Sequence, residues 1–200
     1  MAVKYITDII TGVRPTGDLT IANYLGAIKP ILELQAKGQK LMLFVADIHA
    51  LTDNEPNIVQ QYTREIVMDY LALGIDPEQT VIYKQSDIAG EVTTLMALLA
   101  RQVTVAELLR VPTLKDKLKT NARAETANAL LFLYPVMMAA DILLQRAKNV
   151  PVGEDQLSHL EVTRLLAERF NKKYAEVFPL PPPLQVASLR IHSLKGDTKM

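Results

Sequence analysis

The sequence predicts an α/β fold built on a parallel sheet. Short apolar runs at 6–13, 41–46 and 80–83 alternate with longer stretches whose apolar residues recur at helical spacing. Strands that are apolar throughout and are separated by helices are typical of βαβ units, in which both faces of the sheet are covered. With 200 residues, of which 49% are hydrophobic, the chain is long enough to bury one core.

The first apolar run leads directly into a turn and then into a helix. Pro15 and Gly17 force the turn, and Asp18 or Thr20 can cap the helix that follows. Three residues are expected on its apolar face: Ile21, Leu25 and Ile28. Free backbone N–H groups at such a helix start favour a bound phosphate, although the same arrangement occurs in α/β domains that bind nothing at the turn.

Polar residues follow the second run, at the point where its strand should end. Ligands of open α/β sheets bind at the carboxyl ends of the strands. His49 and Thr52 are therefore candidates for lining a pocket. An Asp47 that caps a helix and a His49 packed in the core explain the same residues equally well.

A carboxylate lies inside the apolar helical stretch Met137–Leu144. Burying the Asp141 carboxylate there costs on the order of several kcal/mol unless another group donates a hydrogen bond to it. The sequence therefore predicts a partner for Asp141. A nearby arginine, lysine or backbone N–H would satisfy it without any ligand.

The last third of the chain begins with a short buried strand at Val150–Gly153. Glu154, Asp155 and Gln156 then open a helix whose apolar residues are Leu157, Leu160, Leu165 and Phe170. Acidic residues at this position also complement the helix dipole without any ligand. A proline-rich connection at 179–183 leads to a final strand at 185–192.

Composition limits the other functions open to the chain. Cysteine is absent and the three histidines are widely spread, so a structural zinc site is not expected. Twenty-two basic and 22 acidic residues give a net charge of zero, which argues against non-specific nucleic-acid binding. No long apolar run or signal-like start is present, so neither a membrane segment nor export is predicted.

Two motifs and the distance between them resemble a known family. The tetrapeptide Thr20–Asn23 lies where class I aminoacyl-tRNA synthetases carry their HIGH signature. The segments Tyr134–Leu144 and Val150–Glu161 are similar to those of the tryptophanyl-tRNA synthetases in particular, with the tyrosyl enzymes as nearest relatives. The resemblance extends from about Thr11 to the end of the chain and implies a Rossmann-type catalytic domain.

The resemblance also implies roles for individual residues. Asp141 would accept the indole N–H of tryptophan while Met138 packs on the ring, Asp155 would accept from the ribose, and Gln156 would reach the ammonium group. The implied catalytic residues are Thr20, Asn23 and Lys199. The implied ATP site comprises Arg14, Pro15, Thr16, Ala22, Asn23, Gly153, Glu154, Asp155, Ile191, Lys199 and Met200. The implied tryptophan site comprises Gly12, His49, Tyr134, Met138, Asp141, Val150, Val152 and Gln156.

Three departures from the family pattern stand out. Ala22 replaces the glycine of the signature, so ATP is expected to sit differently or to bind more weakly. Arg14 stands where many relatives have an uncharged amide, and a guanidinium there matches phosphate oxygens. The chain ends at Lys199 and Met200, the first two residues of the KMSKS-type loop. We therefore expect a catalytic fragment without the anticodon-binding domain.

The implied activity is the ATP-dependent activation of tryptophan followed by its ligation to tRNA(Trp). Magnesium would enter on the ATP phosphates, with no metal held by the protein. A helical insertion at about 91–133 would build a homodimer interface, and its basic residues would lie either near the tRNA acceptor stem or on a solvated face. The location would be cytoplasmic. An impaired synthetase-like protein that binds tryptophan or RNA, and a tyrosine-specific enzyme, remain open alternatives.

Overall fold

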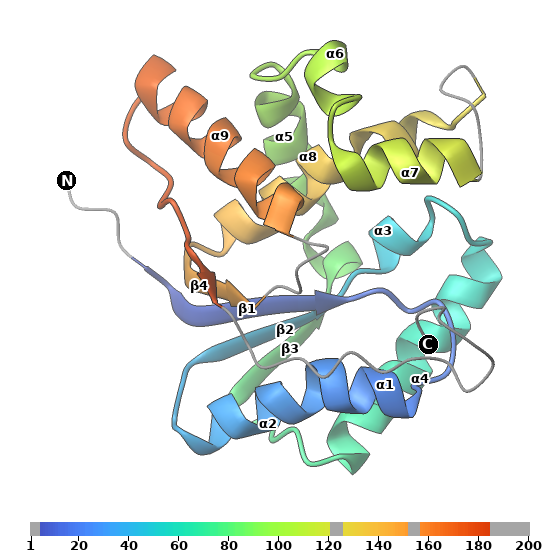
Figure 1. The fold of residues 1–200 in the computed structure, drawn as a ribbon. Coiled ribbons are helices and arrows are strands. Elements are labelled where there is room, and N and C mark those ends of the chain that lie inside the picture. The colour runs from blue at the N-terminus through green and yellow to red at the C-terminus, as the bar shows by residue number, and fades with distance from the viewer. Residues whose placement is uncertain (1–4, 121–125, 152–156, 185–200) are drawn as a thin grey trace.

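The fold is a parallel sheet with helices on both faces, as the computed structural model shows for residues 5–120, 126–151 and 157–184 (Figure 1). The strands lie in the order β3-β2-β1-β4-β5 and all pair in parallel. Their bounds are β1 Thr7–Val13, β2 Leu41–Val45, β3 Thr80–Lys84, β4 Ala147–Pro151 and β5 Pro183–Leu184. The predicted α/β class and parallel sheet are confirmed.

The order of the strands reverses at β1, which lies at the centre of the sheet. From β1 the chain moves outward through β2 to β3 and then returns to β4 on the other side of β1. Lys148 Nζ of β4 and Asp8 Oδ1 of β1 are 2.6 Å apart across this junction. Such a switch point leaves a crevice beyond the carboxyl ends of the two central strands, where ligands of this fold class bind.

Helices follow most of the strands. Their bounds are α1 Ile21–Asn23, η1 Tyr24–Ile28, α2 Lys29–Ala36, α3 Asp47–Ala50, α4 Pro56–Ala72, η2 Gln85–Ile88, α5 Ala89–Ala100, α6 Val105–Leu108, α7 Pro112–Thr120, α8 Ala129–Leu144 and α9 Leu157–Lys173. The predicted helices over 137–144 and from Leu157 onward are confirmed. Within the described residues no helix is long and apolar enough to cross a membrane.

Two hydrophobic cores lie on opposite faces of the sheet because successive strand residues point to opposite sides. Ile9 packs with α2 and α4 residues on one face, whereas its neighbour Ile10 packs with Ile142 of α8 and Leu160 of α9 on the other. In Figure 1, α2 and α4 lie below the sheet, and α5 to α9 lie above it.

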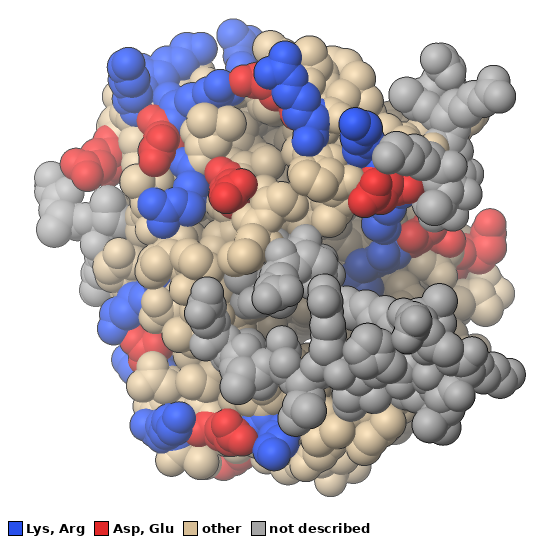
Figure 2. All heavy atoms as spheres, in the orientation of Figure 1, with Lys and Arg blue, Asp and Glu red and all other residues tan. Residues whose placement is uncertain are grey.

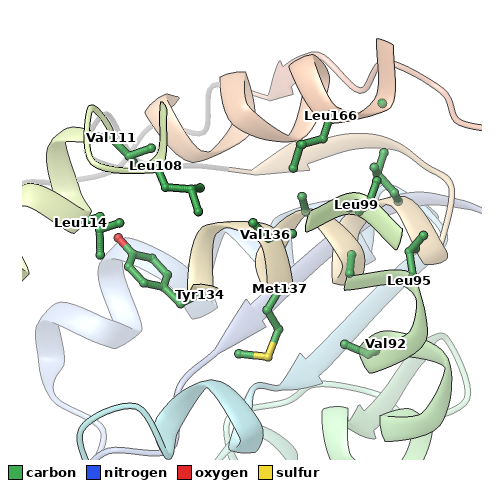
Figure 3. Close-up of a cluster of buried hydrophobic side chains, with 14 of the residues drawn as sticks. Val92, Leu95, Leu99, Leu108, Val111, Leu114, Tyr134, Val136, Met137 and Leu166 are labelled. Carbon is green, nitrogen blue, oxygen red and sulfur yellow. The ribbon is translucent and has the colours of Figure 1, made fainter. Parts of the chain in front are cut away.

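A third core joins the helices above the sheet to one another. Val92 of α5, Leu114 of α7, Val136 of α8 and Leu166 of α9 are all buried in it. Figure 3 shows these side chains converging, with the Tyr134 ring of α8 directed toward Leu114. The helical layer therefore packs as one body on top of the sheet, and α8 contributes to two of the three cores.

The helix after the first turn is not a regular α-helix. Tyr24–Ile28 forms a π-helix, followed at once by Pro30 in the first turn of α2. Proline has no N–H to give to the carbonyl four residues earlier, which favours this local rewinding. The rewinding changes which residues share a face. Ile28 is buried as expected, but Ile21 is 59% exposed, so its predicted place on the apolar face is wrong.

Charges are distributed without a single dominant sign on the face shown in Figure 2. Acidic and basic side chains are interspersed there, with basic ones gathered along the upper edge over the helical layer. The last predicted strand, at 185–192, lies outside the described residues. The insertion predicted at about 91–133 stays a prediction, and α8 runs continuously through its expected end.

Candidate active site

A cavity of about 740 Å³ opens at the carboxyl ends of the central strands. Gly12 and Val13 at the end of β1, Ala46 after β2, and Val150 and Pro151 at the end of β4 line its base. The predicted site residues that line it are Gly12, Arg14, Asn23, His49, Thr52, Tyr134, Met138 and Val150. The structure thus brings together residues from the first turn, α3, α8 and β4.

The Asp141 carboxylate lies on α8 between two cavity-lining residues, Met138 and Ile142. It is 2% exposed, so it needs hydrogen-bond donors. His49 Nε2 lies 3.0 Å from Oδ2, and Gln85 Nε2 lies 2.9 and 2.8 Å from Oδ1 and Oδ2. The predicted partner for Asp141 therefore exists, but it is a histidine and an amide, not an arginine, lysine or backbone N–H.

Burial raises the pKa of Asp141 above its usual value, because a charge is disfavoured away from water. The hydrogen bonds from His49 and Gln85 lower the pKa and oppose this effect. Nearby Tyr83 is partly buried, and this burial together with the Asp141 charge raises the pKa of its hydroxyl. The balance at Asp141 therefore depends on its two donors.

Tyr134 belongs to a second buried polar cluster on the cavity wall. Its hydroxyl donates to Thr113 Oγ1 at 2.9 Å and lies 3.3 Å from His159 Nε2. The Thr113 hydroxyl lies 2.7 Å from the same histidine nitrogen. Thr113, Tyr134 and His159 all line the cavity. They therefore offer a ligand two hydroxyls and an imidazole held in fixed positions.

Arg14 projects from the turn after β1 and pairs with Asp53. Lys117 Nζ of α7 lies 3.4 Å from the other oxygen of the same carboxylate and 5.3 Å from the centre of the Tyr134 ring. Burial raises the pKa of Asp53, but the two cations outweigh this and hold the pKa below its usual value. Two cations thus converge at the rim of the cavity, where an anionic ligand would meet them.

Arg14 also borders a neighbouring cavity of about 640 Å³. Thr16 lines this second cavity with Asp53 and Asn128. Pro15, which lies between Arg14 and Thr16 in the chain, is buried. The Asn128 amide donates to Thr52 O at 2.9 Å, which joins the start of α8 to the loop after α3. Arg14 and Thr52 line both cavities, so the turn after β1 separates two adjoining spaces.

Thr20 and Asn23 form a reciprocal cap at the start of α1. Asn23 Oδ1 accepts from Thr20 N at 2.8 Å and from Thr20 Oγ1 at 2.7 Å, and Asn23 N donates to Thr20 Oγ1 at 3.3 Å. Thr20, of the two predicted candidates, is the N-cap. These hydrogen bonds stabilise the turn. Because Asn23 Oδ1 accepts both bonds from Thr20, the Nδ2 group of Asn23 is the part of its amide that can donate to another acceptor.

Gly12 lies directly beside the ring of Phe44. A Cβ added at Gly12 would come within 2.4 Å of Phe44 Cζ. The ring is buried and stacks on Tyr83 with their centroids 5.8 Å apart. Gly12 is therefore required for close packing at the base of the cavity, in addition to its predicted place in the site.

Several predicted site residues lie outside the described residues, and so do their proposed contacts: Val152, Gly153, Glu154, Asp155, Gln156, Ile191, Lys199 and Met200. The backbone of Ala22 lies in α1. Within the described part of the chain, no group of three or more histidine or acidic side chains is placed to hold a metal ion.

Sequence reasoning missed Gln85 and Thr113. Gln85 follows β3 directly, so the rule that ligand-facing residues gather at strand ends could have found it. Thr113 gave no such signal, because only the folded chain brings α7 beside α8. His159 fits a packing residue by its burial, yet it also lines the cavity.

Known proteins resemble this chain over most of its length. The profile of a family described as tRNA synthetases class I (W and Y) matches residues 6–200. A tryptophan–tRNA ligase of Thermotoga maritima is 45% identical over 175 residues, which is 86% of this chain and 53% of that protein. The chain therefore spans about half the length of this curated relative.

Solved structures show the same likeness. A tryptophanyl-tRNA synthetase from Campylobacter jejuni, complexed with ADP and tryptophan, superimposes with a TM-score of 0.87 at 36% identity, covering 96% of this chain and 59% of that one. A tyrosyl-tRNA synthetase from Aeropyrum pernix gives a TM-score of 0.79 at 20% identity, covering 98% and 56%. The second likeness shows the fold alone.

Proposed function

Because this chain belongs to the class I tRNA synthetase family of the tryptophan and tyrosine enzymes, we propose that it binds and activates tryptophan with ATP. The products would be tryptophanyl-adenylate and pyrophosphate. In the whole protein the tryptophanyl group would then pass to tRNA(Trp). One observation carries the choice of amino acid: a buried carboxylate, Asp141, beside a cavity of about 740 Å³.

The cavity suits a large ring that carries one hydrogen-bond donor. Its volume falls within the range of about 300–1,000 Å³ that is typical of small-molecule sites. Met138 supplies a polarizable sulfur that packs well on an aromatic face. His49 and Gln85 make three contacts with the two oxygens of Asp141. A carboxylate has about four acceptor positions, so one is left for an indole N–H. A ligand without that N–H would leave a buried charge short of a donor.

The polar groups of the cavity wall fit the backbone atoms of an amino acid. The Tyr134 hydroxyl and its neighbours Thr113 and His159 are fixed by one another, so they can orient a ligand at little cost in side-chain entropy. Gln156 is proposed to join Tyr134 at the ammonium group. Gly153 and Asp155 are proposed to meet the ribose. These three contacts rest on the family resemblance.

ATP phosphates are proposed to lie at the first turn. Asn23 lines the cavity, and its Nδ2 group is the donor that the cap with Thr20 leaves for a phosphate oxygen. The Thr20 hydroxyl donates a hydrogen bond to Asn23 Oδ1. Thr20 therefore contributes by holding the Asn23 side chain in place. Arg14 and Lys117 would add positive charge once phosphate replaces Asp53 as their partner.

The reaction needs positioning and charge stabilisation more than proton transfer. The carboxylate of tryptophan is already ionised at neutral pH and attacks the α-phosphorus directly, so no general base is required. Magnesium, bound to the ATP phosphates, would neutralise part of the charge that develops on the pyrophosphate. Lys199 is proposed to lie near this leaving group. The homodimer and the cytoplasmic location are proposed from the family resemblance.

Pyrophosphate exchange with each of the twenty amino acids tests the proposal directly. The assay is run on this chain and on a form extended through the KMSKS-type loop. We expect exchange with tryptophan in the extended form, at a rate about 10²–10³ times that of the 200-residue chain, because one charge-stabilising lysine is restored. Equal rates would show that the loop is dispensable. Exchange with tyrosine alone would contradict the assignment of the amino acid.

Tryptophan binding can be measured separately, because the chain has no tryptophan of its own to mask the fluorescence of the ligand. Asp141→Asn should weaken binding by about 1–3 kcal/mol, since a hydrogen bond to a charged acceptor is lost. Asp69→Asn on α4 is the control and should bind as the unchanged chain does. Equal affinity in both variants would remove Asp141 from the site. Binding of tryptophan without exchange in either form would indicate a sensor.

A further inference from the structure

Gln85 connects two elements of the site and is completely buried. It is the first residue after β3, with 0% of its surface exposed. Its Nε2 donates to both oxygens of Asp141 on α8, at 2.9 and 2.8 Å. Its Oε1 accepts from the backbone N–H of His49 on α3, at 3.2 Å. One amide therefore holds the acceptor of the site and the histidine beside it.

The partners of Gln85 fix which end of its amide faces Asp141. A backbone N–H can only donate, so the amide oxygen must face His49 N. The NH₂ group then has to face Asp141, where it requires an acceptor on the carboxylate oxygens. The arrangement favours the ionised form of Asp141, since a hydrogen bond to the charged form stabilises it.

The other groups around Asp141 act on its charge in opposite directions, because the hydrogen bond with His49 favours the carboxylate and the Asp47 charge opposes it. His49 can either donate to Asp141 or accept from it, depending on which ring nitrogen carries the proton. Asp47 is negative and disfavours a second negative charge nearby. Burial and the Asp141 charge both raise the pKa of the partly buried Tyr83 hydroxyl, so Tyr83 adds no positive charge beside the carboxylate. Among these partners only Gln85 donates by necessity.

We propose that Gln85 is the positioning residue that sets the specificity of the amino-acid site, by keeping the Asp141 carboxylate charged and oriented as the acceptor for a ring N–H. Gln85 contacts no ligand itself. Its effect reaches the ligand through Asp141 and His49. The inference rests on the proposed function, in which Asp141 receives the indole N–H of tryptophan.

The test compares tryptophan with 3-benzothienyl-alanine, which has the same shape but carries sulfur in place of the N–H. Affinities of both are measured by titration calorimetry on the 200-residue chain. Gln85→Met keeps the length of the side chain and removes its donor. We expect tryptophan to bind at least about tenfold more weakly to this variant, because a hydrogen bond to a charged group is worth 1.4 kcal/mol or more. The analogue should change far less.

A buried amide outside the site provides the matched control. Gln102 is 9% exposed, and its amide donates to Leu98 O at 3.4 Å, away from Asp141 and His49. Gln102→Met removes a donor of the same kind from the core. We expect this variant to keep the preference for tryptophan over the analogue. A purely structural loss would lower both affinities together in either variant.

The pH dependence gives a signature that a structural role cannot produce. In Gln85→Met, tryptophan binding should weaken as the pH falls, because Asp141 takes up a proton more easily. In Gln85→Glu, a proton shared between the new carboxyl and that of Asp141 takes the place of the amide donor. As the pH rises this proton is lost and the two carboxylates repel each other, so tryptophan binding should weaken. Dividing by the affinity of the analogue removes effects that act on both ligands alike, such as the titration of the ligand amine.

Each result decides between distinct explanations. A tryptophan preference that survives unchanged in Gln85→Met, or equal losses for both ligands, would overturn the role of Gln85 alone. Absence of a preference in the unchanged chain would overturn the role of Asp141, and with it this inference. If Gln85→Met does not fold, the isosteric Gln85→Glu decides: a ratio of affinities that is flat with pH would overturn the proposal.

Discussion

Replacing Gly12 with alanine tests the packing at the base of the cavity. The added Cβ would lie within 2.4 Å of Phe44 Cζ and 2.5 Å of Phe44 Cε1, closer than unbonded carbon atoms can approach. The ring is buried and stacks on Tyr83, so it cannot turn aside without disturbing the second ring. Overpacking of this kind costs about 1–3 kcal/mol of unfolding free energy.

This cost converts into a measurable shift. For a domain of this size each kcal/mol lowers Tm by about 2–4 °C, so Gly12→Ala should melt about 2–12 °C lower. Gly26→Ala is the matched control. Gly26 also lines the cavity, but an added Cβ there meets nothing within 4 Å. In a helical segment that change should leave Tm unchanged or raise it slightly, because alanine favours helix over glycine.

A second substitution shows whether the contact with Phe44 causes the loss. Leucine lacks the ring atoms that a Cβ at Gly12 would strike. The double variant Gly12→Ala with Phe44→Leu should therefore be more stable than the sum of the two single changes predicts, by about 0.5–3 kcal/mol. The reasoning is refuted if Gly12→Ala has the same Tm as Gly26→Ala. It is also refuted if the effects of Gly12→Ala and Phe44→Leu on the unfolding free energy are additive.

Three further changes probe the charged and capping residues. Asn23→Ala breaks the cap with Thr20 and should lower the unfolding free energy by about 0.5–2 kcal/mol, and calorimetry should show ATP affinity falling more than tryptophan affinity. Hydrogen bonds from Arg169 and from the backbone and side chain of Thr104 lower the pKa of Glu107 from 4.5 to about 2. A carboxyl whose pKa is lowered by folding stabilises the folded state at pH values above its unfolded pKa. The unchanged chain should therefore have a higher Tm than Glu107→Gln above pH 4.5, and this difference should vanish as the pH falls towards 2. A difference in Tm that stays constant with pH would contradict this. Asp53→Asn removes the carboxylate that Arg14 and Lys117 share and should tighten binding of inorganic pyrophosphate, and weaker binding would show that Asp53 only orders the rim.

The local signals of the sequence were enough to predict the sheet and the start of the site. Apolar runs became β1, β2 and β3 within one or two residues, because a strand covered on both faces must be apolar throughout. Thr20 became a helix cap, and Asp141 is buried and needs donors, as its apolar surroundings required.

Contacts between distant segments were beyond such signals. The partners of Asp141 come from positions 92 and 56 residues earlier in the chain, on two other elements. Arg14 finds Asp53 only because the turn after β1 and the loop after α3 meet at the same edge. Ile21 is exposed at the start of α1, directly before the π-helix Tyr24–Ile28. Pattern rules assume a regular helix and miss it.

The central position of β1 constrains how the protein can assemble. Its partner β4 lies far along the chain, and the Asp8–Lys148 contact closes a separation of 140 residues. During synthesis, one edge of β1 therefore stays unpaired until the helices from α5 to α8 have been made. Pairings over such distances fold slowly, and an open strand edge invites association with other chains. The topology that creates the binding crevice thus also leaves a strand edge open in the nascent chain until β4 arrives.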